Sequence, residues 1–373
     1  MKKIITFLII GLVLIACSDD NGDGGDQTSD NFDRVALLTN WADNIIIPAY
    51  ADFNAKLNDL QTSFNTFENE TTQENLVALR AEWLTSYKVW QRVSMFEIGP
   101  AEQVGLRLNI NSYPASVTKI GDNITSGSAN LSLPSNRDAK GFPAIDYLLN
   151  GLASTDGEIV QIYSGNSEGE AHLDYLKLVI QDMTSLSNSV ASSWTNDYRD
   201  TFVNNSGSSA TASVDRFVND FIFYYEKFLR AGKMGIPLGV FTGTPAPNTI
   251  EAFHKADDVS NELFLVGLQA SIDFFNGKHY NSTTRGESLK SYLDELNTVK
   301  NGADLSAAIN TQLETAKTAV SALGAFRTEI ETNNPPTQML NAYQQVQAAV
   351  PLFKVDMVSA MSISIDFVDA DGD

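Results

Sequence analysis

The sequence predicts an all-α protein made of two antiparallel helical bundles. Apolar side chains recur every three or four residues in several segments, and this spacing places them on one face of a helix. The clearest row is Leu76, Leu79, Trp83, Tyr87 and Trp90. Strand signals are scarce, because no two alternating β-branched runs are joined by a tight Asn-Gly or Asp-Gly turn. Helices of this kind bury their apolar faces by packing side by side.

Further helices are predicted in order along the chain. The first begins near Phe32 and is expected to bend around Pro48, because proline disturbs helical hydrogen bonding. The helix over residues 214–230 is expected to end near Gly232, where a Gly- and Pro-rich stretch begins. Four more rows have helical spacing and are interpreted as core packing: Leu57, Leu60 and Phe64; Leu173, Leu176, Ile180, Met183, Leu186 and Val190; Phe217, Phe221, Tyr224 and Phe228; Val346, Val350, Phe353 and Met357.

Two segments interrupt the helical pattern. Residues 121–140 are rich in Ser, Asn and Gly and are predicted to form a long polar loop, a kind of loop that is often functional. Residues 204–211 have the composition of a linker and mark the predicted boundary between the bundles. The first bundle is therefore assigned to residues 32–205 and the second to residues 206–373.

The N-terminal residues predict export and lipid anchoring. Residues 1–16 are typical of a signal peptide, because two lysines precede an apolar run too short to span a bilayer. Cys17 follows Leu14-Ile15-Ala16, which has the pattern of a lipobox, so it is the predicted lipidation site. Residues 17–31 are polar and Gly-rich, as expected of a flexible tether. The predicted location is the bacterial cell envelope, on the periplasmic or cell-surface side of the outer membrane.

Composition and missing motifs exclude several classes of function. The chain has a formal net charge of -21 and a pI near 4.4, which argues against nucleic acid as a partner. It contains no H-E-x-x-H zinc motif and no Walker or Rossmann fingerprint. The acidic residues are too many and too scattered to single out a catalytic pair.

Four motifs in order resemble those of the imelysin-like proteins, and the resemblance covers nearly the whole chain after the tether. Lys140-Gly141-Phe142-Pro143-Ala144-Ile145-Asp146, followed by Leu148-Leu149-Asn150-Gly151, is similar to the family's G-x-H-x-x-E helix with its Leu-Leu-x-Gly turn. The other three are Arg80 through Trp90 with Phe96-Glu97-Ile98-Gly99-Pro100; Asn111-Ser112-Tyr113-Pro114; and Lys233-Met234-Gly235-Ile236-Pro237-Leu238-Gly239 with Pro247 to Glu251.

The resemblance implies two helical bundles with a site between them. The family includes proteins described as insulin-cleaving peptidases, as iron-regulated envelope proteins and as parts of iron-uptake systems, and the motif's His and Glu are its supposed metal ligands. This chain has Pro143 and Asp146 at those positions. We expect Pro143 at the first helical position and Asp146 in the first turn, where the helix dipole favours a carboxylate. Iron or zinc would then be held weakly, because the imidazole is missing.

The candidate ligand-binding residues follow from these motifs: Asp146, Pro143, Glu97, Arg80, Lys233 and Glu251. His254 lies three residues after Glu251, a spacing used by di-iron bundles, but no second such motif exists, so it is interpreted as a solvated helix histidine. The favoured function is a non-catalytic binding lipoprotein for a metal or small molecule in iron or other nutrient acquisition. A metallopeptidase and a scaffold partner of an outer-membrane transporter remain alternatives.

Overall fold

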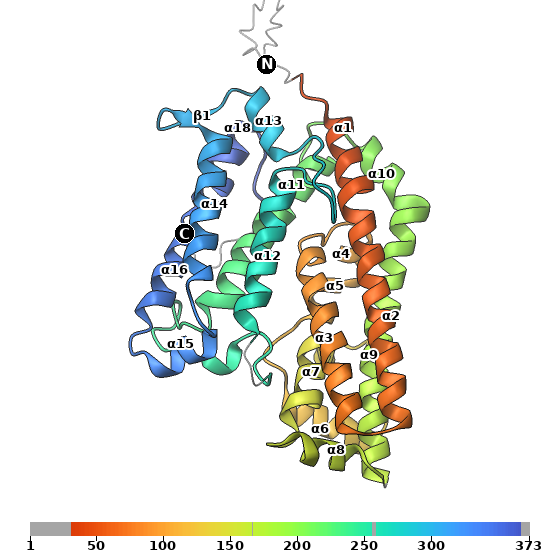
Figure 1. Ribbon diagram of the computed structural model, residues 1–373. Helices are drawn as coiled ribbons and strands as arrows, with labels where there is room; N and C mark the ends of the chain where they lie inside the picture. The colour runs from red at the N-terminus through yellow and green to blue at the C-terminus, as the bar shows by residue number, and fades with distance from the viewer. Residues whose placement is uncertain (1–30, 166, 256–258, 367–373) are drawn as a thin grey trace, which may run out of the picture. The chain divides into compact units, whose positions relative to one another are not determined.

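A computed structural model of the chain describes residues 31–165, 167–255 and 259–366 (Figure 1). The chain divides into two units, Met1–Asn31 and Phe32–Asp373, and every helix and strand described below belongs to the second. The predicted signal peptide, Cys17 and almost all of the tether lie outside the described residues. Within the described ranges, no helix combines the length and the apolar character needed to cross a membrane.

Three long helices form the framework of the first bundle. The helix α2 (Ile47–Asn69) packs against α3 (Gln73–Val93) and against α9 (Ser167–Ser193). The predicted apolar rows face this packing, since Leu57, Leu60 and all five members of the row from Leu76 to Trp90 are buried. Pro48 does not interrupt the chain's first helix, because α1 (Arg34–Thr39) runs through the π-helical segment η1 (Asn40–Ile46) directly into α2.

Shorter elements complete this bundle: α4 (Pro100–Val104), α5 (Leu106–Ile110), α6 (Val117–Ser126), the 3₁₀ segment η2 (Pro134–Ala139), α7 (Gly141–Asp146), the π segment η3 (Tyr147–Gly151), α8 (Asp156–Tyr163), the π segment η4 (Trp194–Tyr198) and α10 (Arg199–Asn204). Side chains cap several of them. Thr155 and Glu158 form a reciprocal capping box at the start of α8, which satisfies two backbone N–H groups that a helix end leaves unpaired.

The prediction of one long loop over residues 121–140 is wrong for much of that segment. Its first part continues α6, whose N-terminus is capped when the Ser116 hydroxyl accepts a hydrogen bond from the Lys119 backbone N–H. Only Ile120 and Ile124 are buried on this helix. Two apolar residues one turn apart are too few to stand out as periodicity in a Ser- and Asn-rich segment. Residues 127–133 remain outside regular helices.

The second bundle begins with α11 (Ser213–Phe223), which continues as the π-helical segment η5 (Tyr224–Gly235). This helix therefore ends at Gly235 and not near Gly232. The other elements are the 3₁₀ segment η6 (Pro247–Thr249), α12 (Ser260–Phe275), α13 (Leu289–Glu295), α14 (Leu305–Ser321), α15 (Phe326–Thr332), α16 (Thr337–Gln347), α17 (Ala349–Pro351), the π segment η7 (Leu352–Met357), α18 (Val358–Ala360), and the antiparallel strands β1 (Val299–Lys300) and β2 (Ala303–Asp304).

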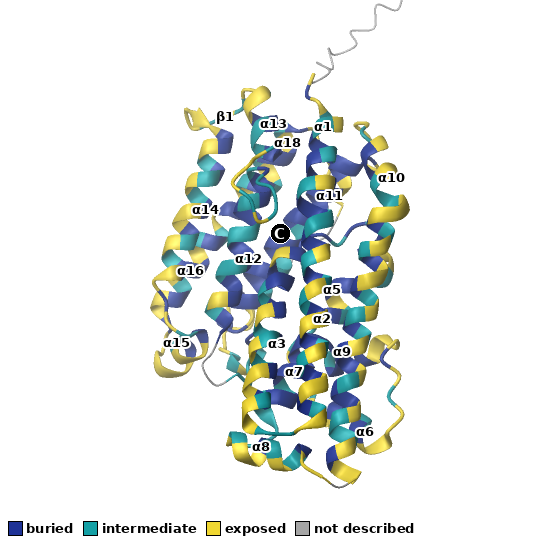
Figure 2. Cartoon of the chain, turned by 45° about the vertical axis from the view of Figure 1, so that its right-hand side comes forward, coloured by how far each residue is buried: buried dark blue, intermediate teal, exposed yellow. Residues whose placement is uncertain are grey.

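The two bundles share one continuous apolar core. The helix α12 packs against α3 of the first bundle and against α14 of the second, and the buried faces of all three turn inward (Figure 2). The Trp41 ring lies edge-on to Phe217 at 5.1 Å between centroids and 5.1 Å from Phe274. Residues 205–212 lie outside helices, as expected of the predicted linker. The boundary between residues 205 and 206 stays a prediction.

Candidate functional site

The altered signature forms the short helix α7 and the π segment that follows it. Gly141 begins α7 with a φ of +74°, and a side-chain Cβ there would lie 2.1 Å from the Ile110 carbonyl oxygen, so only glycine fits. Pro143 is the third helical residue, not the first as predicted. Its missing N–H still belongs to the first turn, where no intrahelical partner exists. Asp146 ends α7 and does not lie in its first turn.

Asp146 reaches from the first bundle to the second. Its carboxyl group is buried, and Oδ2 accepts a hydrogen bond from the His254 backbone N–H at 2.7 Å. Oδ1 accepts from the Asn150 side-chain amide at 3.0 Å. Burial raises the pKa of Asp146 from its usual 3.8 to about 7, against the opposing effect of these hydrogen bonds. The carboxyl group therefore holds the segment of the second bundle that contains His254. It does not stabilise the start of a helix.

A cavity of about 230 Å³ lies where α7 meets this loop. Pro143 and Asp146 line one side, and Asn248 and His254 line the other. The remaining lining residues are Tyr113, Pro114, Ala115, Val117, Ile250, Ala252 and Phe253. We call this space the signature cavity. Its lining residues include members of three of the four motifs that carry the family resemblance.

Next to the signature cavity, a buried polar network centres on Glu251. Its carboxylate forms an ion pair with Lys233 of η5, and both side chains are almost fully buried. The other carboxylate oxygen accepts hydrogen bonds from the Asn111 amide at 2.7 Å and from the Gln91 amide at 3.1 Å. Burial lowers the pKa of Lys233, while the charge of Glu251 acts in the opposite direction. We call these four side chains the Glu251 network.

Two tyrosines connect the Glu251 network to its surroundings. The Tyr87 hydroxyl donates a hydrogen bond to the Asn111 side-chain oxygen. Tyr113 lines the signature cavity, and burial followed by the charge of Glu251 raises its pKa well above the usual value. Among the described residues, the buried Gln91 Oε1 has no hydrogen-bond partner. An unsatisfied buried acceptor is uncommon in folded proteins, and this one lies on the side chain whose amide donates to Glu251.

The structure separates Glu97 and Arg80 from this site. Glu97 lies with Asp220 and Arg107 in another cavity of about 280 Å³ that shares no lining residue with the signature cavity. Its carboxylate accepts a hydrogen bond from the Arg107 backbone N–H at 2.8 Å, and burial raises its pKa to about 7. Arg80 donates two hydrogen bonds to the Leu149 carbonyl and pairs with Asp156 at 2.7 Å. Arg80 therefore fixes the end of the signature helix and lines neither cavity.

His254 lies in the signature cavity, although the sequence suggested a solvated helix histidine. The segment from Glu251 to His254 is a turn, so these two side chains do not share a helix face. The imidazole packs edge-on against Tyr147 at 5.1 Å. A Cβ on Gly151 would lie 2.7 Å from His254 Nδ1, so this glycine makes room for the ring. Burial, together with the charge of Arg327, lowers the pKa of His254.

The donor set does not fit the metal centre that the family resemblance implies. Pro143 offers no ligand atom, and both oxygens of Asp146 already accept hydrogen bonds. Across residues 31–165, 167–255 and 259–366, no group of three or more His, Cys, Asp or Glu residues is placed to hold an ion. Structural and catalytic zinc sites use at least three protein ligands.

Comparison with known proteins agrees with the motifs. A family model described as Imelysin, and labelled as a peptidase family, matches residues 46–350. The chain belongs to the imelysin family. Over 119 residues it is 27% identical to iron-regulated protein A of Synechococcus elongatus, a match that spans 31% of this chain and 32% of that protein. The chain thus matches about a third of the length of that relative.

Two solved structures share the imelysin fold with this chain. One is described as an iron-regulated protein A precursor from Parabacteroides distasonis, with a TM-score of 0.69, 16% identity, and coverage of 87% of this chain and 95% of that one. The other is an imelysin-like protein from Psychrobacter arcticum, with a TM-score of 0.67, 16% identity, and coverage of 90% and 97%. These likenesses establish the all-α fold.

Sequence reasoning missed three members of the site: His254, Gln91 and Asn111. His254 follows the fourth motif by three residues, but its proximity to α7 depends on how the bundles pack. Gln91 follows Trp90 on α3 and carries no signal of its own. Asn111 stood inside a quoted motif, and its amide could have been weighed as a partner for the buried Glu251.

Proposed function

We propose that this chain is a non-catalytic binding lipoprotein of the bacterial envelope that acts in acquiring iron or another nutrient. One observation carries the proposal: Asp146, at the position of a supposed metal ligand, uses one oxygen to hold the His254 wall of a cavity and the other to accept a hydrogen bond from Asn150 of its own segment. Pro143 adds no ligand atom beside it. A cavity beside a pair of residues that lacks the motif's His favours binding of a small polar molecule over metal-dependent hydrolysis.

The link to iron rests on the names of two relatives, the Synechococcus protein and the Parabacteroides structure. The envelope location rests on residues 1–31, through a lipid on Cys17. An outer-membrane transporter is the proposed partner, because a lipid-anchored binding protein needs a route for its ligand into the cell. Metallopeptidase activity is the competing function, and the family label favours it.

Iron-limited growth tests the proposal. A strain lacking the gene should grow more slowly than its parent when 2,2′-dipyridyl chelates the medium, and the natural gene should restore growth. Ala115→Phe, which fills the signature cavity, should fail to restore it. Val77→Phe adds the same ring at an exposed position of α3 and serves as the matched control. Equal growth of the deletion strain and its parent would contradict the role in iron acquisition.

Two further measurements separate the parts of the proposal. The chain from Ser18, incubated with zinc and insulin B chain, should leave the peptide intact. Cleavage that disappears in Asp146→Ala would establish the peptidase instead. Cys17→Ser should move the protein from the membrane fraction to the soluble fraction. A variant that stays with the membrane after a high-salt wash would rule out the lipid anchor.

A further inference from the structure

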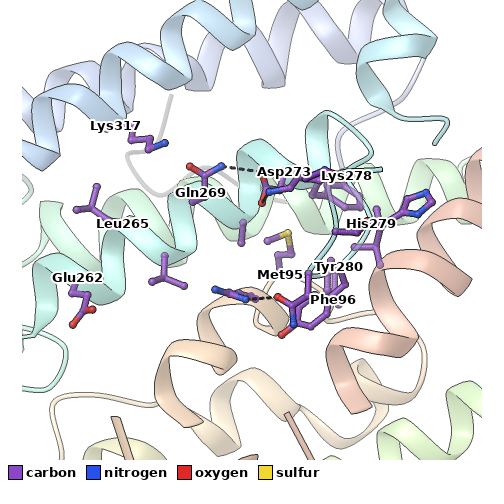
Figure 3. A pocket seen from close by; sticks show the side chains of 18 residues that line it. Met95, Phe96, Glu262, Leu265, Gln269, Asp273, Lys278, His279, Tyr280 and Lys317 are labelled. Carbon is purple, nitrogen blue, oxygen red and sulfur yellow. Dashed lines mark hydrogen bonds and ion pairs between the residues drawn. The ribbon is translucent and has the colours of Figure 1, made fainter. Parts of the chain in front are cut away.

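A groove of about 840 Å³ lies away from the signature cavity and shares no lining residue with it (Figure 3). One side of α12 forms its base, the end of α3 forms one wall, and residues 278–283 form another. In this view, Lys317 of α14 and Glu262 of α12 lie toward one end of the groove. His279 lies toward the other end. This volume lies within the range of small-molecule sites.

The floor of the groove is apolar. Met95, Phe96 and Phe274 are buried at its base. Leu265 and Val266 of α12 are partly exposed along it. An apolar floor of this kind suits the hydrocarbon or aromatic body of a ligand, because covering it removes apolar surface from water.

The wall over residues 278–283 is held in place by the first bundle. The Tyr280 backbone N–H donates to the Asn44 carbonyl at 2.8 Å, and the Tyr280 hydroxyl donates to Asp52 at 2.6 Å. Within the wall, the His279 N–H donates to the Thr284 carbonyl at 2.9 Å. These bonds pin both ends of the wall, so the groove is preformed and a ligand need not order it.

The carboxylates that line the groove are already paired. Asp273 accepts from Lys278 at 3.0 Å and from Gln269 at 2.9 Å, a contact that Figure 3 draws as a dashed line. Glu262 forms an ion pair with Lys88 at 2.5 Å. Neither acidic side chain is left to balance a bound cation.

Lys278 is the cation paired with Asp273, but the other two cations that line the groove, Arg92 and Lys317, are not paired in the same way. Arg92 donates to the neutral Asn281 side chain at 2.9 Å, and no carboxylate of the described residues lies within ion-pair distance of it. Within the described part of the chain, Lys317 has only Glu314 as an ion-pair partner, at 3.9 Å and with both side chains exposed. The groove therefore carries surplus positive charge in a chain whose formal net charge is -21.

We propose that this groove binds a small amphipathic organic anion. The apolar body lies on the floor formed by α12 and the residues that follow α3, and the anionic group lies at the Arg92 guanidinium. Arginine is well suited to bind the anionic group, because its planar guanidinium can donate two parallel hydrogen bonds to a carboxylate or sulfonate. The site is independent of the proposed function of the signature cavity.

Two probes with the same aromatic body test this proposal. The dye 8-anilinonaphthalene-1-sulfonate carries an anionic group, and N-phenyl-1-naphthylamine lacks it. The full chain should bind the sulfonate more tightly, and raised salt should reduce that preference. Arg92→Gln should weaken sulfonate binding about tenfold, which is the scale of one charge-assisted hydrogen bond, and should leave the neutral probe unchanged.

Two variants locate the binding. Ala270→Phe places a ring over the α12 side of the groove and should abolish binding of both probes. Lys290→Gln removes an exposed lysine of α13 outside the groove and should change neither affinity. Far-ultraviolet circular dichroism checks that every variant is folded. Equal affinity for the two probes, or sulfonate binding that survives Ala270→Phe, would overturn the proposal.

Discussion

The signature cavity and the Glu251 network each contain a buried carboxylate at the seam between the bundles, yet the two carboxylates are satisfied differently. Glu251 faces a buried lysine and two amides. Asp146 accepts hydrogen bonds from backbone N–H groups of the second bundle and from the Asn150 amide, and the charge of Lys255 contributes less to it than these hydrogen bonds do. Lys233 and Glu251 of the second bundle thus form an ion pair. The changed signature of the first bundle has become a support for a loop.

This difference predicts that breaking the ion pair has the largest effect. Lys233→Met should destabilise the protein by about 3–5 kcal/mol, because Glu251 would stay buried without its cation. Urea unfolding followed by circular dichroism measures the loss. Lys290→Met, which breaks an exposed pair with Asp294, should cost less than about 1 kcal/mol. Similar losses in the two variants would mean that Glu251 is reached by water.

The pH dependence of Asp146 is the second prediction. Its pKa is about 7 in the folded chain against an ordinary 3.8, so the native state holds the proton more tightly. Stability from this group is full below pH 4 and is lost as pH rises toward 7. Asp146→Asn should therefore gain stability relative to the natural chain over that window, by as much as about 4 kcal/mol.

Glu97 provides the control for this pH effect, because burial also raises its pKa to about 7 in a separate cavity. Glu97→Gln should produce its own shift in the same window, and the double variant should add the two. A stability difference between Asp146→Asn and the natural chain that does not change from pH 4 to pH 7 would refute the raised pKa of Asp146.

The packing of His254 against Gly151 gives a smaller effect. Gly151→Ala places a Cβ within 2.7 Å of the imidazole and of the Tyr147 ring, and overpacking of this kind costs about 1–3 kcal/mol. His254→Ala should remove part of that cost when it is combined with Gly151→Ala, and the contact with the Tyr147 ring should account for the rest. Additive losses in this double-mutant cycle would place the imidazole away from Gly151.

Restoring the family's signature should have the smallest effect. The double variant Pro143→His and Asp146→Glu should raise zinc affinity about tenfold over the natural chain, because two ligands beside His254 approach the three that zinc sites use. Calorimetric titration with zinc measures both proteins. His254→Ala in the double variant should cancel the gain. Tight stoichiometric zinc binding by the natural chain would reverse the interpretation of Asp146.

The sequence predicted the fold well because helix periodicity is a local property. Trp83, Trp90, Phe221 and Tyr224 are all buried, as an interpretation in terms of core packing requires. The helix α6 escaped prediction because its buried face holds two apolar residues. Local sequence patterns therefore fail where a helix is short and mostly polar.

The site was predicted only in part, because it is assembled by tertiary packing. Lys233 and Glu251 were chosen from one motif and do meet, eighteen positions apart in the chain. Arg80 and Glu97 came from the same kind of resemblance, yet they serve other contacts. Whether a motif residue faces the seam depends on the rotation of its helix against the partner bundle, which spacing within one segment does not determine.

The π-helical segment η5 has a consequence for how this chain compares with its relatives. A one-residue insertion in an α-helix turns everything beyond it by about 100°. A π segment already contains such extra residues, since its hydrogen bonds run from i to i+5. A relative with one residue fewer between Tyr224 and Gly235 would form α-helical turns there. Its counterpart of Lys233 would still face its counterpart of Glu251. Alignments across this stretch should therefore allow a gap just before Lys233.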